Sequence, residues 1–208
     1  MNRLFRLAAA AIAALSLAGC VGESIWDSDE AVARATYVPP GPATVTVITS
    51  TNTRMDSGAH TGLLIDGAQR LLFDPAGSWF NPGIPERNDV LFGMTPEYLD
   101  LYLAFQSNGV FEVTMQTVEV SPAVAQQLSQ VVQSYGAVSP SQCTRSISTI
   151  LSNTPGFEAV SPTWFPTALL NDMANVPGVQ TRIVEGTLGD QEDLTERPVL
   201  EQIAAQGQ

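Results

Sequence analysis

The feature that most constrains this chain is a short apolar run that ends at a cysteine. Arg3 and Arg6 precede the run, and residues 7–19 are apolar or small up to Cys20. A transmembrane helix needs about 20 apolar residues, so this run is too short to span a bilayer. A charged start, an apolar middle and small residues before a cleavage site are the layout of a secretory signal. We therefore expect residues 1–19 to be removed and the mature chain to lie on the outer side of a membrane.

The end of the run, Leu17-Ala18-Gly19-Cys20, resembles the lipobox of bacterial lipoproteins. The resemblance implies that cleavage falls just before Cys20 and that this cysteine carries the lipid. Because several acyl chains give stable attachment, the membrane is an expected partner. An ordinary signal peptide followed by a chance cysteine is the alternative. Val21 at the next position resembles lipoproteins sorted to the outer rather than the inner membrane, which implies a periplasm-facing protein of the cell envelope.

Cysteine and histidine are scarce in this chain. Its two cysteines are Cys20 and Cys143, and its single histidine is His60. Once Cys20 carries lipid, no intramolecular disulfide can form, and Cys143 is a free thiol in a compartment where thiols usually pair. One cysteine and one histidine cannot build a zinc site of the usual Cys/His kind, so we expect no metal and no cofactor. They can form a nucleophile and its base.

The charge of the chain excludes one class of partner. The sequence has nine arginines, no lysine and 21 acidic residues, and loss of the signal leaves seven arginines and a net charge of −14. Nucleic-acid binding needs clustered basic side chains, so we expect no nucleic-acid partner. Anionic headgroups are repelled as well, so attachment to the membrane depends on the lipid anchor.

Beyond the signal, the chain divides into three parts. Residues 20–42 are expected to form a flexible tether, because Pro39-Pro40-Gly41-Pro42 resists both helix and sheet. Residues 43–185 suit a single domain with a real hydrophobic core. Residues 186–208 are acidic and polar, and we expect a disordered tail there.

Local patterns predict the elements of the domain. β-branched and alternating runs predict strands, Asp66-Gly67 predicts a hairpin turn, and Ser or Thr before Pro predicts helix starts. The expected strands are residues 44–49, 60–65, 69–73, 110–120 and 179–184. The expected helices are residues 95–105, two helices opened by Ser121 and Ser139, and residues 166–173. Strands and helices in separate runs, with an antiparallel hairpin, indicate an α+β fold.

Three residues are candidates for catalysis. Residues 139–142 fit a capping box with Pro140 at the first helical position, which places Cys143 in the first turn of a helix. The positive end of a helix dipole lowers the pKa of a thiol and favours the reactive thiolate. His60 is expected at the start of a strand and Asp74 at the end of the strand paired with it. A carboxylate there can fix the tautomer of the imidazole.

The residues around these candidates resemble a known superfamily. The run from His60-Thr61-Gly62 to Asp74-Pro75 resembles the segment around the histidine of the papain-like NlpC/P60 superfamily, and Cys143-Thr144-Arg145-Ser146 resembles its catalytic-cysteine helix. The cysteine follows the histidine here, as in the circularly permuted branch. The resemblance covers roughly residues 58–155. The chain departs from it at Gln142, where Asp or Asn is common, and in the long aromatic loop after Asp74.

The resemblance implies a function and a role for each residue. It implies an antiparallel sheet with packed helices, of permuted papain-like architecture. Cys143 would be the nucleophile, His60 the general base and then acid, and Asp74 the orienting group, with the Cys143 N–H in an oxyanion hole. The expected function is a membrane-anchored cysteine hydrolase or acyltransferase. Its substrate would be an amide or ester bond of the cell envelope, in a peptidoglycan peptide or a lipid acyl group.

The same residues have structural interpretations. Cys143 is then a small buried side chain beside apolar neighbours, His60 ends a strand, and Asp74-Pro75 starts a turn. Four aromatic residues near Pro and Gly either line a groove or pin loops to the core, namely Trp79, Phe80, Trp164 and Phe165. The alternative function is a non-catalytic envelope lipoprotein that serves as a binding or scaffold module.

Overall fold

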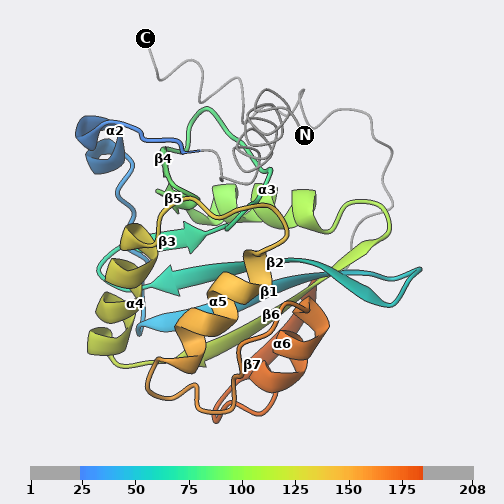
Figure 1. Cartoon of the computed structure of the whole chain (residues 1–208). Helices are drawn as coiled ribbons and strands as arrows, with labels where there is room; N and C mark the ends of the chain where they lie inside the picture. The colour runs from blue at the N-terminus through green and yellow to red at the C-terminus, as the bar shows by residue number, and fades with distance from the viewer. Residues whose placement is uncertain (1–23, 185–208) are drawn as a thin grey trace, which may run out of the picture.

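The computed structural model describes residues 24–184 as an α+β fold built on one antiparallel sheet (Figure 1). The seven strands lie in the order β4-β5-β3-β2-β1-β6-β7. The strands are β1 (Thr44–Asn52), β2 (Ser57–Asp66), β3 (Arg70–Phe73), β4 (Glu86–Arg87), β5 (Val90–Phe92), β6 (Phe111–Glu119) and β7 (Gln180–Val184). The helices are α2 (Asp29–Arg34), α3 (Pro96–Gln106), α4 (Pro122–Ser134), α5 (Cys143–Ser152) and α6 (Pro166–Met173).

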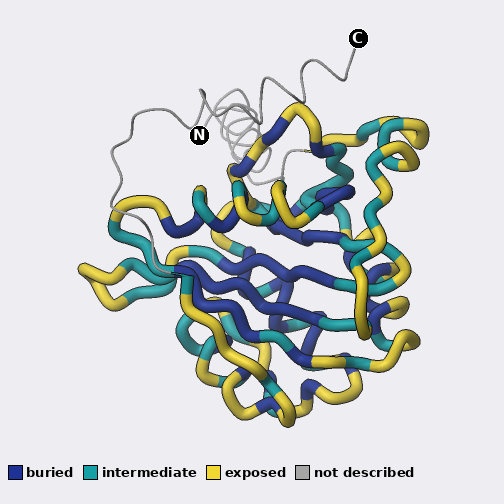
Figure 2. The backbone as a smooth tube through the Cα atoms, turned by 180° about the vertical axis from the view of Figure 1, so that it is seen from behind, coloured by how far each residue is buried: buried dark blue, intermediate teal, exposed yellow. Residues whose placement is uncertain are grey.

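Helices cover both faces of the sheet. On one face, α4, α5 and α6 pack against the strands, and α3 packs on the other (Figure 1). Side chains along a strand alternate between the faces. Leu63 and Ile65 of β2 therefore join the core under α4, α5 and α6, whereas Leu64 joins the core under α3. Figure 2 shows the middle of the sheet as a continuous buried region. The central strands are apolar on both faces because both are covered.

Several local predictions are confirmed. β2 and β3 pair as an antiparallel hairpin in which Asp66 faces Arg70, as the Asp66-Gly67 turn predicts. The Thr95 side chain caps α3, and the Ser121 side chain caps α4, each with Pro at the first turn. β2 begins at Ser57, so His60 lies within the strand rather than at its start.

The predicted start of α5 is wrong. The helix begins at Cys143 with Gln142 as its N-cap, and Gln142 makes no side-chain capping bond. Ser141 has φ +68°, a left-handed conformation outside the helical region. The helix therefore begins at Cys143 rather than at Pro140, and Cys143 still lies in its first turn.

The segment before β1 makes more contacts than a tether needs. Residues 24–42 include α2, and an isolated bridge joins Trp26 to Arg87 of β4. The Arg87 guanidinium also lies over the Trp26 ring, 4.8 Å from its centroid. The prolines that suggest a tether limit local structure only, and they leave tertiary packing open. The predicted signal peptide, the predicted lipid-carrying Cys20 and the predicted disordered tail at residues 186–208 lie outside the described residues. Within residues 24–184, no helix combines the length and apolarity needed to cross a bilayer.

Candidate active site

Cys143 occupies the open end of α5. The first backbone hydrogen bond of the helix runs from the Ser146 N–H to the Gln142 carbonyl (2.9 Å), so the N–H groups of residues 143–145 lie at the N-terminal end. The Thr144 N–H lies near the Cys143 sulfur and helps to lower the pKa of the thiol. Cys143 is only 9% exposed. Its sulfur therefore sits where backbone donors and the helix dipole favour the thiolate.

His60 and Asp74 come from neighbouring strands. Asp74 directly follows β3, which is paired with the strand that contains His60. The His60 Nε2 and Asp74 Oδ1 atoms are 2.6 Å apart, and the side chains are 17% and 4% exposed. This bond occupies Nε2, which leaves Nδ1 as the ring nitrogen available to another partner. Asp74 therefore lies where the orienting carboxylate of a nucleophile–base–acid triad would hold the imidazole.

The Cys143 thiol and the His60 ring also interact, and each shifts the pKa of the other. Burial alone would lower the pKa of His60. The hydrogen bonds to Asp74 and Cys143 and the charges of both groups outweigh burial, and the pKa rises to about 10. Burial raises the pKa of Cys143, but the hydrogen bond and charge of His60 lower it below the ordinary value of a thiol. The imidazolium therefore stabilises the thiolate, and the thiolate stabilises the imidazolium.

Tyr102 forms a hydrogen bond to the Asp74 carboxylate. Its hydroxyl donates a 2.7 Å hydrogen bond to Asp74 Oδ1, the same oxygen that contacts His60. Tyr102 is fully buried in α3, and its ring stacks edge-on against Trp79 with centroids 5.7 Å apart. Burial and the nearby carboxylate raise the pKa of Tyr102 well above its ordinary value, so the hydroxyl keeps its proton. Tyr102 acts as a positioning residue for Asp74.

Two glycines make room for this arrangement. A Cβ atom on Gly62 would lie 2.7 Å from the Tyr102 hydroxyl oxygen, closer than real Cβ atoms approach. A Cβ atom on Gly77 would collide with the Asp74 carboxylate, because the Gly77 backbone folds back over it and its N–H bonds to the Asp74 carbonyl (2.9 Å). The absence of side chains at these two positions therefore lets Tyr102 and Asp74 meet.

A buried pair of threonines joins the helix to the strand. The hydroxyls of Thr61 and Thr144 are 2.9 Å apart, and both residues are fully buried. Thr61 follows His60 in β2, and Thr144 follows Cys143 in α5. The Thr144 hydroxyl is also 3.8 Å from the Cys143 sulfur. The hydrogen bond between the two threonines therefore fixes the separation of β2, which holds the imidazole, and α5, which holds the thiol.

A cavity of ≈ 440 Å³ adjoins the triad through Asp74. The loop after β3 forms one wall, with Trp79 and Phe80, and the segment leading to α5 forms another, with Val138 and Pro140. Trp79 and Phe80 thus line a hollow, as one sequence interpretation predicts. The other walls include Ile25, Glu86, Asp89 and Leu91.

The other two aromatic candidates lie outside this cavity. Trp164 and Phe165 are 53% and 69% exposed and precede α6. A Cβ atom on Gly58 would collide with Pro166, so the start of α6 lies against the beginning of β2.

Within residues 24–184, no group of three or more His, Cys, Asp and Glu side chains is arranged to hold a metal ion.

The tertiary structure thus brings together the three residues singled out from the sequence and adds Tyr102, Thr61 and Thr144. Tyr102 was missed because it looks like any other core aromatic of a helix, and Asp74 lies 28 residues earlier in the chain. The threonine pair joins positions 83 residues apart. Neither contact has a local signal in the sequence.

Comparison of the chain with protein-family models, with curated proteins and with solved structures finds no match.

We expect Tyr102→Phe to lower the free energy of unfolding by about 1–3 kcal/mol, because it removes a buried hydrogen bond to a charged group. Tyr98→Phe is the matched control, since Tyr98 lies one turn earlier in the same helix and is only partly buried. Urea melts of the two variants measure the difference. Equal stabilities would mean that the Tyr102 hydroxyl does not support Asp74.

Proposed function

We propose that the protein is a lipid-anchored cysteine hydrolase or acyltransferase of the cell envelope. Its substrate would be an amide or ester bond, in a peptidoglycan peptide or in a lipid acyl group. The observation that supports this most is the 2.6 Å contact between His60 and Asp74, together with the coupling by which His60 and the Cys143 thiol shift each other's pKa. A helix, a strand and the loop after a neighbouring strand supply these groups, and buried neighbours orient them. Catalytic nucleophiles, bases and orienting groups are related in this way.

The chemistry follows from the protonation states. The Cys143 thiolate would attack the carbonyl carbon and form a C–S bond, and the oxyanion would face the N–H groups at the start of α5. When the C–N or C–O bond breaks, the His60 imidazolium would give its proton to the leaving group. Neutral His60 would then take a proton from water, in hydrolysis, or from an acceptor alcohol or amine, in acyl transfer. The attack of that oxygen or nitrogen on the thioester would release Cys143.

The architecture is consistent with a permuted papain-like domain. The nucleophile begins a helix that packs on the sheet beside the strand of the histidine, and a neighbouring strand supplies the third group. The order of residues along the chain is histidine, carboxylate, cysteine. This order and packing support the resemblance drawn from the sequence motifs. The lipobox supports attachment at Cys20 on the periplasmic side of the outer membrane.

The pH dependence of Cys143 alkylation tests the ion pair. With its pKa below that of an ordinary thiol, near 8.5, the processed protein should react with iodoacetamide at pH 6 faster than glutathione does. Because the His60 pKa is raised to about 10, the imidazolium exists below that pH. Turnover should therefore hold across neutral pH and fall as the pH rises through about 10.

His60→Ala is the matched variant for this experiment. Without the imidazolium, burial dominates, and the alkylation profile should move to higher pH than in the wild type. A wild-type profile that rises only above pH 8 would refute the thiolate–imidazolium pair. A Cys143 that stays unreactive at every pH, in a protein inert toward both peptidoglycan and envelope lipids, would favour the non-catalytic lipoprotein.

A further inference from the structure

The first described residues of the chain are fastened to one end of the domain. The Ser24 hydroxyl lies 2.9 Å from Asn88 Oδ1, and the Asn88 N–H donates to the Ile25 carbonyl (3.0 Å). The Asp27 N–H donates to the Glu86 carbonyl (3.0 Å), and the Glu86 N–H donates to the Asp27 carboxylate (2.7 Å). The chain therefore leaves the fold at a defined place, next to β4.

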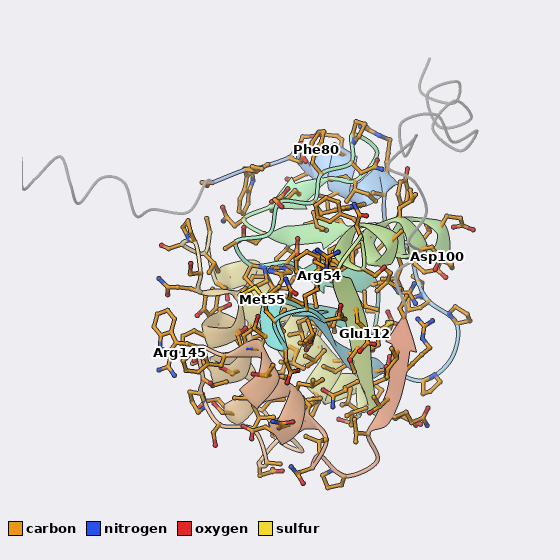
Figure 3. All side chains as sticks on the ribbon, turned by 90° about the vertical axis from the view of Figure 1, so that its right-hand side faces the viewer. Arg54, Met55, Phe80, Asp100, Glu112 and Arg145 are labelled. Atoms are coloured by element: carbon orange, nitrogen blue, oxygen red, sulfur yellow. The ribbon has the colours of Figure 1, made fainter. Side chains whose placement is uncertain are left out.

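That place is the rim of the cavity beside the triad. Ile25 lines the cavity together with Phe80, and Trp26 follows Ile25 directly. We call these three side chains the rim. Ile25 is 37% exposed, Trp26 63% and Phe80 76%. Figure 3 shows Phe80 at the top of the domain, well apart from Met55 on the β1–β2 hairpin and from Arg145 on α5.

The length of chain between the lipid and the rim limits how the domain can stand on a membrane. Cys20 is four residues before Ser24, and four extended residues span at most about 14 Å. A domain of this size has a radius of gyration of about 15 Å and hence a width of about 40 Å. An anchor at Cys20 therefore keeps the rim close to the bilayer, and it cannot bring the opposite end of the domain there.

We propose that Ile25, Trp26 and Phe80 rest on the phospholipid bilayer that holds the Cys20 anchor, so that the cavity beside Asp74 opens at the membrane surface. The proposal rests on the lipid anchor of the proposed function. Tryptophan and other amphipathic aromatics favour the interface between headgroups and acyl chains. With a mature net charge of −14, contact depends on apolar burial rather than on attraction to anionic lipid.

The orientation has a consequence for the substrate. A cavity that opens at the membrane surface is within reach of molecules held in that membrane. A cavity on the far side would face the periplasm instead. The orientation therefore brings the cavity that Asp74 lines within reach of lipid acyl groups.

Site-specific photo-crosslinking tests the orientation. The full-length, processed protein is reconstituted in phosphatidylcholine–phosphatidylethanolamine vesicles with radiolabelled acyl chains. Benzoylphenylalanine replaces Phe80 in one sample and an exposed control residue in two others. The controls are Met55 on the hairpin, 74% exposed, and Phe165 before α6, 69% exposed. We expect at least about tenfold more labelled lipid on position 80 than on either control, since only the rim lies within reach of the lipid.

Two readings separate the possible failures. Vesicle flotation reports the anchor, and thermal melts report the fold of each sample. A protein that floats but labels at position 55 or 165 as strongly as at position 80 overturns the orientation and leaves the proposed catalysis standing. Cys20→Ala is the control that lacks the anchor and should not float. If the wild-type protein does not float either, the orientation is overturned together with the lipoprotein part of the proposed function.

Discussion

Cys143→Ser is expected to abolish turnover while leaving the fold intact. The serine hydroxyl is smaller than the thiol and far less acidic, so the neighbouring imidazole cannot hold it as an anion as it holds the thiolate. Loss of a catalytic nucleophile removes about 10³-fold or more of the rate. The measurements are release of fragments from purified peptidoglycan and of fatty acid from envelope lipids, with thermal melts as the check on folding.

Ser152→Ala is the matched control for this variant. Ser152 lies at the other end of α5, where its hydroxyl donates to the Thr149 carbonyl (3.0 Å) and accepts from the Asn153 side-chain amide (3.5 Å). We expect this variant to keep wild-type turnover, since it lies more than two turns from the sulfur. Wild-type turnover in Cys143→Ser would show that another group performs the chemistry.

His60→Ala is expected to lose about as much activity as Cys143→Ser, because residues that act as a unit do not contribute additively. Asp74→Asn should lose less. The amide oxygen can still accept the hydrogen bond from Nε2, but the charge that stabilises the imidazolium is gone. A hydrogen bond to a charged group is worth about 1.5–3 kcal/mol, which corresponds to a loss of about 10- to 100-fold in rate.

Asp66→Asn is the matched control for Asp74→Asn. Asp66 is also a poorly exposed carboxylate of the same hairpin, but it pairs with Arg70 (2.6 Å) rather than with His60. Its substitution should reduce stability without changing the rate constant of the folded enzyme. If Asp74→Asn and Asp66→Asn reduced turnover equally, the role of Asp74 would be structural rather than catalytic.

The local elements show how far sequence patterns reach. The Asp66-Gly67 hairpin and the capped starts of α3 and α4 depend on residues within one turn of each other, so the sequence predicts them correctly. β4 and β5 were missed in a Gly- and Pro-rich loop. They are two and three residues long, and they exist because they pair with one another and β5 pairs with β3. Such short strands have no intrinsic stability.

The α5 start shows why a local pattern can fail. Residues 139–142 match a capping box, but Asp89 from a distant loop accepts a hydrogen bond from the Val138 N–H (2.7 Å), and Ser141 adopts a left-handed turn. The left-handed backbone at Ser141 keeps residues 139–142 out of the helix, so its start is delayed until Cys143. The delay makes this cysteine the first residue of the helix and brings its sulfur to the open end, where the Thr144 N–H reaches it.

The sequence by itself determined which side chains are candidates for this chemistry, because the chain has one histidine, His60, and one cysteine, Cys143, besides Cys20. Only the tertiary structure decided how they meet. The Tyr102 hydroxyl, the threonine pair and the glycines under Asp74 act across gaps of up to 83 residues. Contacts of this kind depend on how helices and strands pack. Neither the periodicity of apolar residues nor the spacing of motifs along the chain predicts that packing.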